Sequence, residues 1–104
     1  MYKPIILPLA KEDIKEAAHW YNTKKKGLGK RFTKAVRTEV KYICKHPKSA
    51  AIRYDDTRCA VLDVFPFMIH YTIEESQKTV IISAVFHTSR SPQKWEKRKV
   101  QDHK

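Results

Sequence analysis

The sequence has few of the residues that cross-link a chain or interrupt its secondary structure. It contains two glycines and two cysteines, Cys44 and Cys59, among 104 residues. Two cysteines are too few for a disulfide framework, and this pair lacks the spacing of a metal site. We expect both thiols to be buried, and we expect no bound metal and no cofactor.

The chain also lacks long apolar runs, internal repeats and low-complexity segments. No stretch approaches the roughly 20 apolar residues that cross a bilayer, and the N-terminus does not have the pattern of a secretory signal. We therefore expect a cytoplasmic protein with no membrane partner. A length of 104 residues predicts a single domain over residues 1–104.

Acidic residues are scarce relative to basic ones. Eleven acidic residues stand against 22 lysines and arginines, which gives a formal net charge of +11 at pH 7. Such a charge attracts nucleic acid, acidic protein segments or anionic lipid. A solvated basic surface without a partner has the same composition, so charge alone does not choose among these.

The positions of proline, glycine and apolar residues divide the chain into elements. The run "YKPIILP" contains Pro4, which restricts a strand there to the edge of a sheet. Helical spacing of apolar residues predicts helices from Ala10 to about Lys24 and from about Lys30 to Lys45. The two glycines flank Leu28 between these segments, and they predict an antiparallel helical hairpin.

After a loop around "KSAAIRYDD", the apolar period becomes alternating. The segments "TRCAVL", "FPFMIHYTI" and "KTVIISAVFH" predict a three-stranded antiparallel meander. Pairing Ile73 with Lys78 turns one set of side chains toward the helices. That set is Phe67, Ile69, Tyr71, Ile73, Val80, Ile82, Ala84 and Phe86.

The opposite face is then expected to be open and half polar. It carries Met68, His70, Val85 and His87, and Arg58 joins them if Cys59 and Val61 face the core. Ser91–Pro92 predicts the start of a short C-terminal helix, followed by a basic tail at about 99–104. The whole pattern predicts an α+β fold made of an N-terminal edge strand, a helical hairpin, the meander and the short helix.

Five phrases in this order resemble the RelE/ParE superfamily of bacterial toxins. They are "EDIKEAAHWYN", "GLGKRF", "HP", "FPFMIHYTI" and "VIISAVFHTSRSPQKW", and the resemblance spans Tyr2 to Arg98. It implies the toxin of a type II toxin–antitoxin module, also known as a plasmid stabilization protein, which arrests growth when released. It further implies a cognate antitoxin that is acidic and partly disordered when free, and a toxin–antitoxin hetero-oligomer as a possible assembly.

The family has two branches with different targets. Toxins similar to RelE are ribosome-dependent mRNA endoribonucleases, and those similar to ParE poison DNA gyrase. Metal-independent RNA cleavage needs an acid, a base and cations on the phosphate. The candidates for these catalytic roles are Arg58, His87 and Arg90, with His70 as a further acid or base.

Other positions depart from the ribonuclease pattern. RelE-like enzymes carry lysines before the second strand, an arginine at its end and a tyrosine near the C-terminus. This chain has Asp55–Asp56, Asp63 and Trp95 around those places. The "VFH" that ends the last strand resembles the ParE-like branch, in which the C-terminal segment is implied to contact the target. The target-binding candidates are Arg90, Lys94, Trp95 and Arg98.

We therefore predict a gyrase-directed toxin. A RelE-like ribonuclease and an inactive family member that acts only as a binding module remain the alternatives. His87 could equally be a strand-end histidine bonded to nearby backbone, and Trp95 an anchor that docks the last helix.

Overall fold

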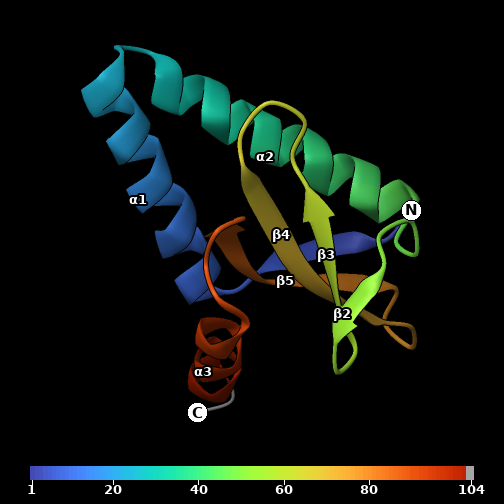
Figure 1. Ribbon diagram of the computed structural model, residues 1–104. Coiled ribbons are helices and arrows are strands. Elements are labelled where there is room, and N and C mark those ends of the chain that lie inside the picture. The colour runs from blue at the N-terminus through green and yellow to red at the C-terminus, as the bar shows by residue number, and fades with distance from the viewer. Residues whose placement is uncertain (103–104) are drawn as a thin grey trace.

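The structure is a computed structural model in which residues 1–102 are described, with side chains described through Arg98. The elements in chain order are β1 (Lys3–Ile6), α1 (Pro8–Lys24), α2 (Leu28–Lys45), β2 (Ile52–Tyr54), β3 (Thr57–Val61), β4 (Phe67–Glu74), β5 (Thr79–His87) and α3 (Pro92–Asp102). Figure 1 shows α1 and α2 as a hairpin beside the sheet, and α3 as a separate element after β5. The predicted α+β fold is confirmed.

Both glycines are needed to close the hairpin between α1 and α2. Gly27 has φ 86°, in the left-handed region that favours glycine. Gly29 lies where the helices approach so closely that a Cβ there would collide with the carbonyl oxygen of Ala18. Its N–H also donates to Asn22 Oδ1 at 2.8 Å. These contacts fix where α1 lies against the rest of the molecule.

The α2 helix is amphipathic, as predicted. One face is buried against the sheet and carries Phe32, Val36, Val40, Ile43 and Cys44. The opposite face is exposed and carries Lys30, Lys34, Arg37, Lys41 and Lys45. The apolar face provides much of the main core, which forms between the helical hairpin and the sheet.

The sheet has the strand order β1-β5-β4-β3-β2. The predicted meander is present as β3, β4 and β5, and β1 adds to it in parallel with β5 at the edge. Pro4 is tolerated there because an edge strand leaves one side without ladder bonds. The short β2 was not predicted, because Ile52–Tyr54 is brief and lies in a segment that reads as a loop.

A β-bulge at Ser83 changes which side chains share a face. Ile73 pairs with Val80 instead of Lys78, and Tyr71 pairs with Ile82, so the predicted faces hold near the hairpin turn. Past the bulge His70 pairs with Ala84, which leaves Ser83 as the extra residue. Ala84 and Phe86 therefore leave the helix-facing side on which they were predicted.

The same shift moves His87. It pairs with Phe67, and Val85 pairs with Ile69, so both now lie on the side that faces the helical hairpin. The predicted placement of His87 on one face with His70 is therefore wrong. An extra residue in one strand reverses the alternation beyond it, and this reversal carries His87 to the other face.

The face predicted to be open is covered by α3. Trp95 packs there on a second apolar cluster that contains Cys59, Met68, Ala84 and Phe86. His70 lies in the same layer and has no exposed surface. The prediction that α3 starts at Pro92 is confirmed, and the helix continues into the predicted tail as far as Asp102. Residues 103–104 of that tail lie outside the described residues.

Candidate functional site

A small pocket lies where the middle of α1 faces the end of β5. It has a volume of about 280 Å³. Its chemically active lining comes from Glu16 and Trp20 on α1, His87 at the end of β5, and Arg90 just beyond it. Asp13, Ala17, Phe67 and Val85 complete the wall. The pocket therefore combines a carboxylate, an imidazole, a guanidinium and an indole.

The sequence after β5 holds His87 in one orientation. The imidazole lies edge-on to Phe67, with ring centroids 5.3 Å apart. The Ser89 backbone N–H donates to His87 Nδ1 at 3.1 Å, and Ser89 Oγ lies 2.7 Å from the same nitrogen. Because a backbone N–H only donates, Nδ1 is the acceptor and the neutral ring carries its proton on Nε2. His87 is exposed, so Nε2 is available to a partner.

A tight turn brings Arg90 to the same pocket. The Arg90 N–H donates to the His87 carbonyl at 3.0 Å, which closes the turn. Its guanidinium carbon lies 4.3 Å from the centre of the Phe86 ring, in cation–π geometry. Arg90 is partly exposed. His87 and Arg90 therefore line one pocket, and their joint role in a functional site stays a prediction.

Glu16 and Trp20 were not singled out from the sequence. Both are exposed, and Trp20 keeps 54% of its surface accessible. Trp20 lies outside the apolar face of α1, which contains Ala17 and Tyr21. A large aromatic residue off the apolar face of a helix is the signal that could have identified this side of the pocket.

His70 is a structural residue of the second apolar cluster. Burial is the main cause that lowers its pKa to about 4, and nearby Arg53, Arg98 and Arg90 add to the effect. Tyr54 Oη lies 2.9 Å from His70 Nδ1, and Cys59 Sγ lies 3.5 Å from it. A buried, neutral imidazole has no access to a substrate, so the suggested role as an acid or base is not compatible with this position.

Arg58 lies away from His87 and Arg90. It pairs with Tyr71 in the sheet, so it lies on the face opposite His70. Its Nη1 donates to the carbonyl oxygens of Ala50 at 2.6 Å and Lys48 at 3.3 Å. From the strand register, Arg58 is separated from His87 by roughly 13 Å along the strands and two strand spacings across them. The three proposed catalytic residues therefore do not converge.

Of the target-binding candidates on α3, two side chains pack against the rest of the molecule and one is exposed. Trp95 is 5% exposed, and its ring centre lies 4.8 Å from that of His70. Arg98 forms a bidentate ion pair with Asp13, with both distances 2.7 Å. These two residues hold α3 in place, which matches the anchor interpretation of Trp95. Lys94 is exposed on α3. A role in target binding remains a prediction for all four candidates.

Among the described side chains, which end at Arg98, no cluster of three or more His, Cys, Asp or Glu is arranged to hold a metal ion. No helix in the described part of the chain combines the length and the apolar character needed to span a bilayer.

The fold resembles solved structures of bacterial toxins. The isolated RelE toxin of E. coli superposes with a TM-score of 0.65 at 14% identity, covering 97% of this chain and 99% of that one. A chain of the chromosomal ParDE toxin–antitoxin system from P. aeruginosa superposes with a TM-score of 0.62 at 15% identity, covering 84% of this chain and 96% of that one. A sequence search of curated proteins gives no match.

These structures define the class as the RelE/ParE toxin fold. The family model for the ParE toxin of the type II toxin–antitoxin system, parDE, matches residues 5–92. The chain therefore belongs to the ParE toxin family, whose members are toxins of type II toxin–antitoxin systems.

Proposed function

We propose that this toxin arrests bacterial growth by binding DNA gyrase in the cytoplasm, without cleaving RNA, until its antitoxin binds it. The observation that carries this proposal is the match of the ParE family model over residues 5–92. The contact surface in the proposal is the pocket of Glu16, Trp20, His87 and Arg90, together with the exposed Lys94 nearby in sequence.

Two structural observations support binding over catalysis. Arg58 donates to backbone carbonyls far from His87, and His70 is buried and neutral. The remaining pocket is rich in groups that recognise a protein surface: an exposed indole, a guanidinium and an imidazole N–H. Trp, Tyr and Arg are the residue types that contribute most strongly to protein interfaces.

A ribosome-dependent ribonuclease is the second candidate, and one feature of the pocket favours it. Glu16, His87 and Arg90 line a single pocket. A carboxylate, an imidazole and a cation are the groups that acid–base cleavage of RNA requires. In this case the catalytic set would be Glu16, His87 and Arg90, without Arg58.

Induced expression of the chain in a bacterium, followed by two assays, separates the candidates. A gyrase toxin inhibits supercoiling of relaxed plasmid by purified gyrase and induces the DNA damage response. A ribonuclease leaves supercoiling intact and shortens messenger RNA in a translating extract. Growth arrest with neither effect contradicts both candidates, and no arrest at all favours an inactive binding module.

Paired substitutions then test the pocket. His87→Ala with Arg90→Ala is expected to reduce inhibition of gyrase by at least about tenfold, the scale of a lost interface anchor. The matched control is His46→Ala with Arg37→Ala, which removes the same residue types from an exposed position on α2 and from its exposed C-cap. Equal inhibition by the two double variants, both folded, excludes the pocket from the contact surface.

A further inference from the structure

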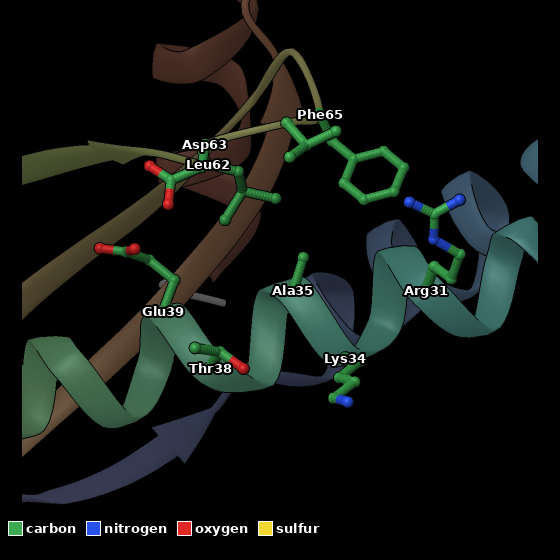
Figure 2. A pocket seen from close by; sticks show the side chains of 9 residues that line it. Arg31, Lys34, Ala35, Thr38, Glu39, Leu62, Asp63 and Phe65 are labelled. Carbon is green, nitrogen blue, oxygen red and sulfur yellow. The ribbon is translucent and has the colours of Figure 1, made fainter.

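A second pocket, apart from the one beside His87, lies between α2 and the connection from β3 to β4. It has a volume of about 390 Å³. Figure 2 shows its arrangement, with Glu39 and Asp63 at one end, Ala35, Leu62 and Phe65 in the middle, and Arg31 at the other end. We call it the α2 groove.

Packing and a backbone hydrogen bond hold the walls of the α2 groove in place. Leu62 and Phe65 are only 4% and 7% exposed. The Phe65 ring packs against Tyr21 and Phe32, with centroids 5.0 Å and 5.3 Å apart. The Leu62 N–H donates to the Phe67 carbonyl at 2.9 Å, which closes the connection above α2. The groove is therefore preorganised, so little entropy is lost when a partner binds.

One residue of this rigid connection is left uncovered. Val64 lines the groove and keeps 76% of its surface exposed, although its neighbours Leu62 and Phe65 are buried. A partner that fills the groove would cover this side chain. Burial of an apolar side chain that the free protein exposes is a favourable term in association.

The charge at one end of the groove is opposite to that of the rest of the molecule. The chain has 11 acidic and 22 basic residues, yet two of the acidic side chains, Glu39 and Asp63, point toward each other here. Burial raises the pKa of Glu39, and the nearby Asp63 raises it further. Two carboxylates that repel each other are stabilised by a cation placed between them.

The exposed valine and the carboxylate pair indicate which kind of partner the α2 groove can bind. Carboxylates repel the phosphates of nucleic acid, and a net charge of +11 on each copy opposes self-association. Among the described side chains no third ligand completes a metal site with this pair. An exposed valine beside a pair of carboxylates suits a protein segment that presents a basic side chain next to an apolar one.

We propose that the α2 groove binds a segment of the antitoxin that places a lysine or arginine between Glu39 and Asp63 and an apolar side chain over Val64 and Leu62. Arg31 at the far end faces an acidic residue of the same segment. Arg31 and Glu39 are eight positions apart on α2, or about 12 Å. In an antitoxin helix the acidic and basic residues would therefore also be about eight positions apart, with the apolar residue between them.

The groove would thereby select the cognate antitoxin. Acidic antitoxin segments are attracted by the whole basic surface of the toxin, so general charge does not distinguish one antitoxin from another. A basic residue required at one position does distinguish them, because a segment with an acid or a neutral residue there leaves Glu39 and Asp63 uncompensated. This proposal depends on the antitoxin partner and not on gyrase as the target.

The test uses the toxin co-purified with the antitoxin of its own operon. Dissociation of the complex is measured for three toxin variants: Glu39→Lys with Asp63→Lys, Val64→Ser, and the control Glu12→Lys. Glu12 is an exposed acid on α1 whose only ion pair in the described chain is a 4.0 Å contact with Lys15. We expect the double variant to dissociate at least about tenfold faster and Val64→Ser a few fold faster, with the control unchanged.

A compensating change in the antitoxin makes the result specific. Exchanging its predicted basic residue for glutamate is expected to restore slow dissociation to the double variant and to weaken binding to the original toxin. Thermal melting of each free toxin checks that it is folded. Dissociation of the double variant at the control rate overturns the proposal. So does a free toxin that dimerises through Val64, or a double variant that loses gyrase inhibition while retaining its antitoxin.

Discussion

Asp13 on α1 and Arg98 on α3 are joined by a bidentate ion pair across the end of the sheet, with both N···O distances 2.7 Å. The same carboxylate accepts the Val85 N–H at 3.0 Å, and Arg98 donates to the Ser83 carbonyl at 3.3 Å. β1 reaches only as far as Ile82, so Asp13 provides the partner that Val85 would otherwise lack on that side. The pair therefore ties α1, the bulge in β5 and α3 together.

Loss of this pair is expected to be costly. The two side chains are only 9% and 14% exposed, so Asp13→Ala leaves Arg98 with a poorly solvated charge and Val85 with an unpaired N–H. We expect the free energy of unfolding to fall by roughly 3 kcal/mol, measured by urea denaturation. The matched control is Glu12→Ala, which removes an exposed pair with Lys15 and should cost less than about 0.5 kcal/mol. Equal losses from the two substitutions would contradict the buried ion pair.

Trp95 is expected to act through its shape and not through its indole N–H. It is 5% exposed, and Trp95 Nε1 has no hydrogen-bond partner among the described residues. Trp95→Ala should cost roughly 3–5 kcal/mol, because it leaves a cavity between α3 and the sheet. Trp95→Phe loses no hydrogen bond and should cost less than half of that. The comparison is Trp20→Ala at a 54% exposed position, and a similar cost at both tryptophans rules out the docking role.

His70 should make stability depend on pH. Burial holds its pKa at about 4 in the folded chain, below its ordinary value of 6.5. Between these values the unfolded chain binds the proton and the folded chain does not, so stability is complete above pH 6.5 and falls as the pH drops toward 4. The total loss is roughly 3 kcal/mol. Urea denaturation from pH 7.5 to 4.0 measures it, and His70→Gln should flatten that part of the profile. An unchanged slope in the variant assigns the effect to other groups.

Much of the fold follows directly from residue periodicity. The helices, the edge strand with Pro4 and the meander each have a pattern that fits only one element. The faces at the far end of β5 do not, because strict alternation in "TVIISAVFH" assigns Ala84 and Phe86 to the core side and nothing in the sequence marks an extra residue. The bulge at Ser83 reverses the faces beyond it, and the backbone groups beside it bond to Asp13 on α1 and Arg98 on α3.

The pocket beside His87 could likewise be predicted only in part from the sequence. His87 and Arg90 are close in sequence, and a tight turn suffices to bring them together. Glu16 and Trp20 join them only through the packing of α1 on the sheet, a contact between distant segments. Arg58 could not be placed from the sequence, because its face depends on the register of β3 against β4, which the irregular segment "LDVFPF" does not reveal.

The position of α1, and with it Glu16 and Trp20, is expected to depend on Gly29. A methyl group there would collide with the carbonyl oxygen of Ala18, a backbone atom that cannot swing aside, and it would also crowd the side-chain amide of Asn22. Gly29→Ala should therefore lower the free energy of unfolding by about 2 kcal/mol or more, even though alanine favours a helix by up to about 1 kcal/mol. Gly27→Ala meets no atom within 4 Å and suffers only from its φ of 86°, so about 1–2 kcal/mol is expected.

A third variant separates steric collision from hydrogen bonding at the helix crossing. Asn22→Ala removes only the acceptor of the Gly29 N–H and should cost about 1 kcal/mol. If collision dominates, Gly29→Ala also changes the fluorescence of Trp20, because α1 must shift, whereas Asn22→Ala does not. Because this shift would open the pocket beside His87, Gly29→Ala should weaken target inhibition in a protein that is still folded. Unchanged Trp20 fluorescence and inhibition in Gly29→Ala would show that α1 keeps its position without a glycine at the crossing.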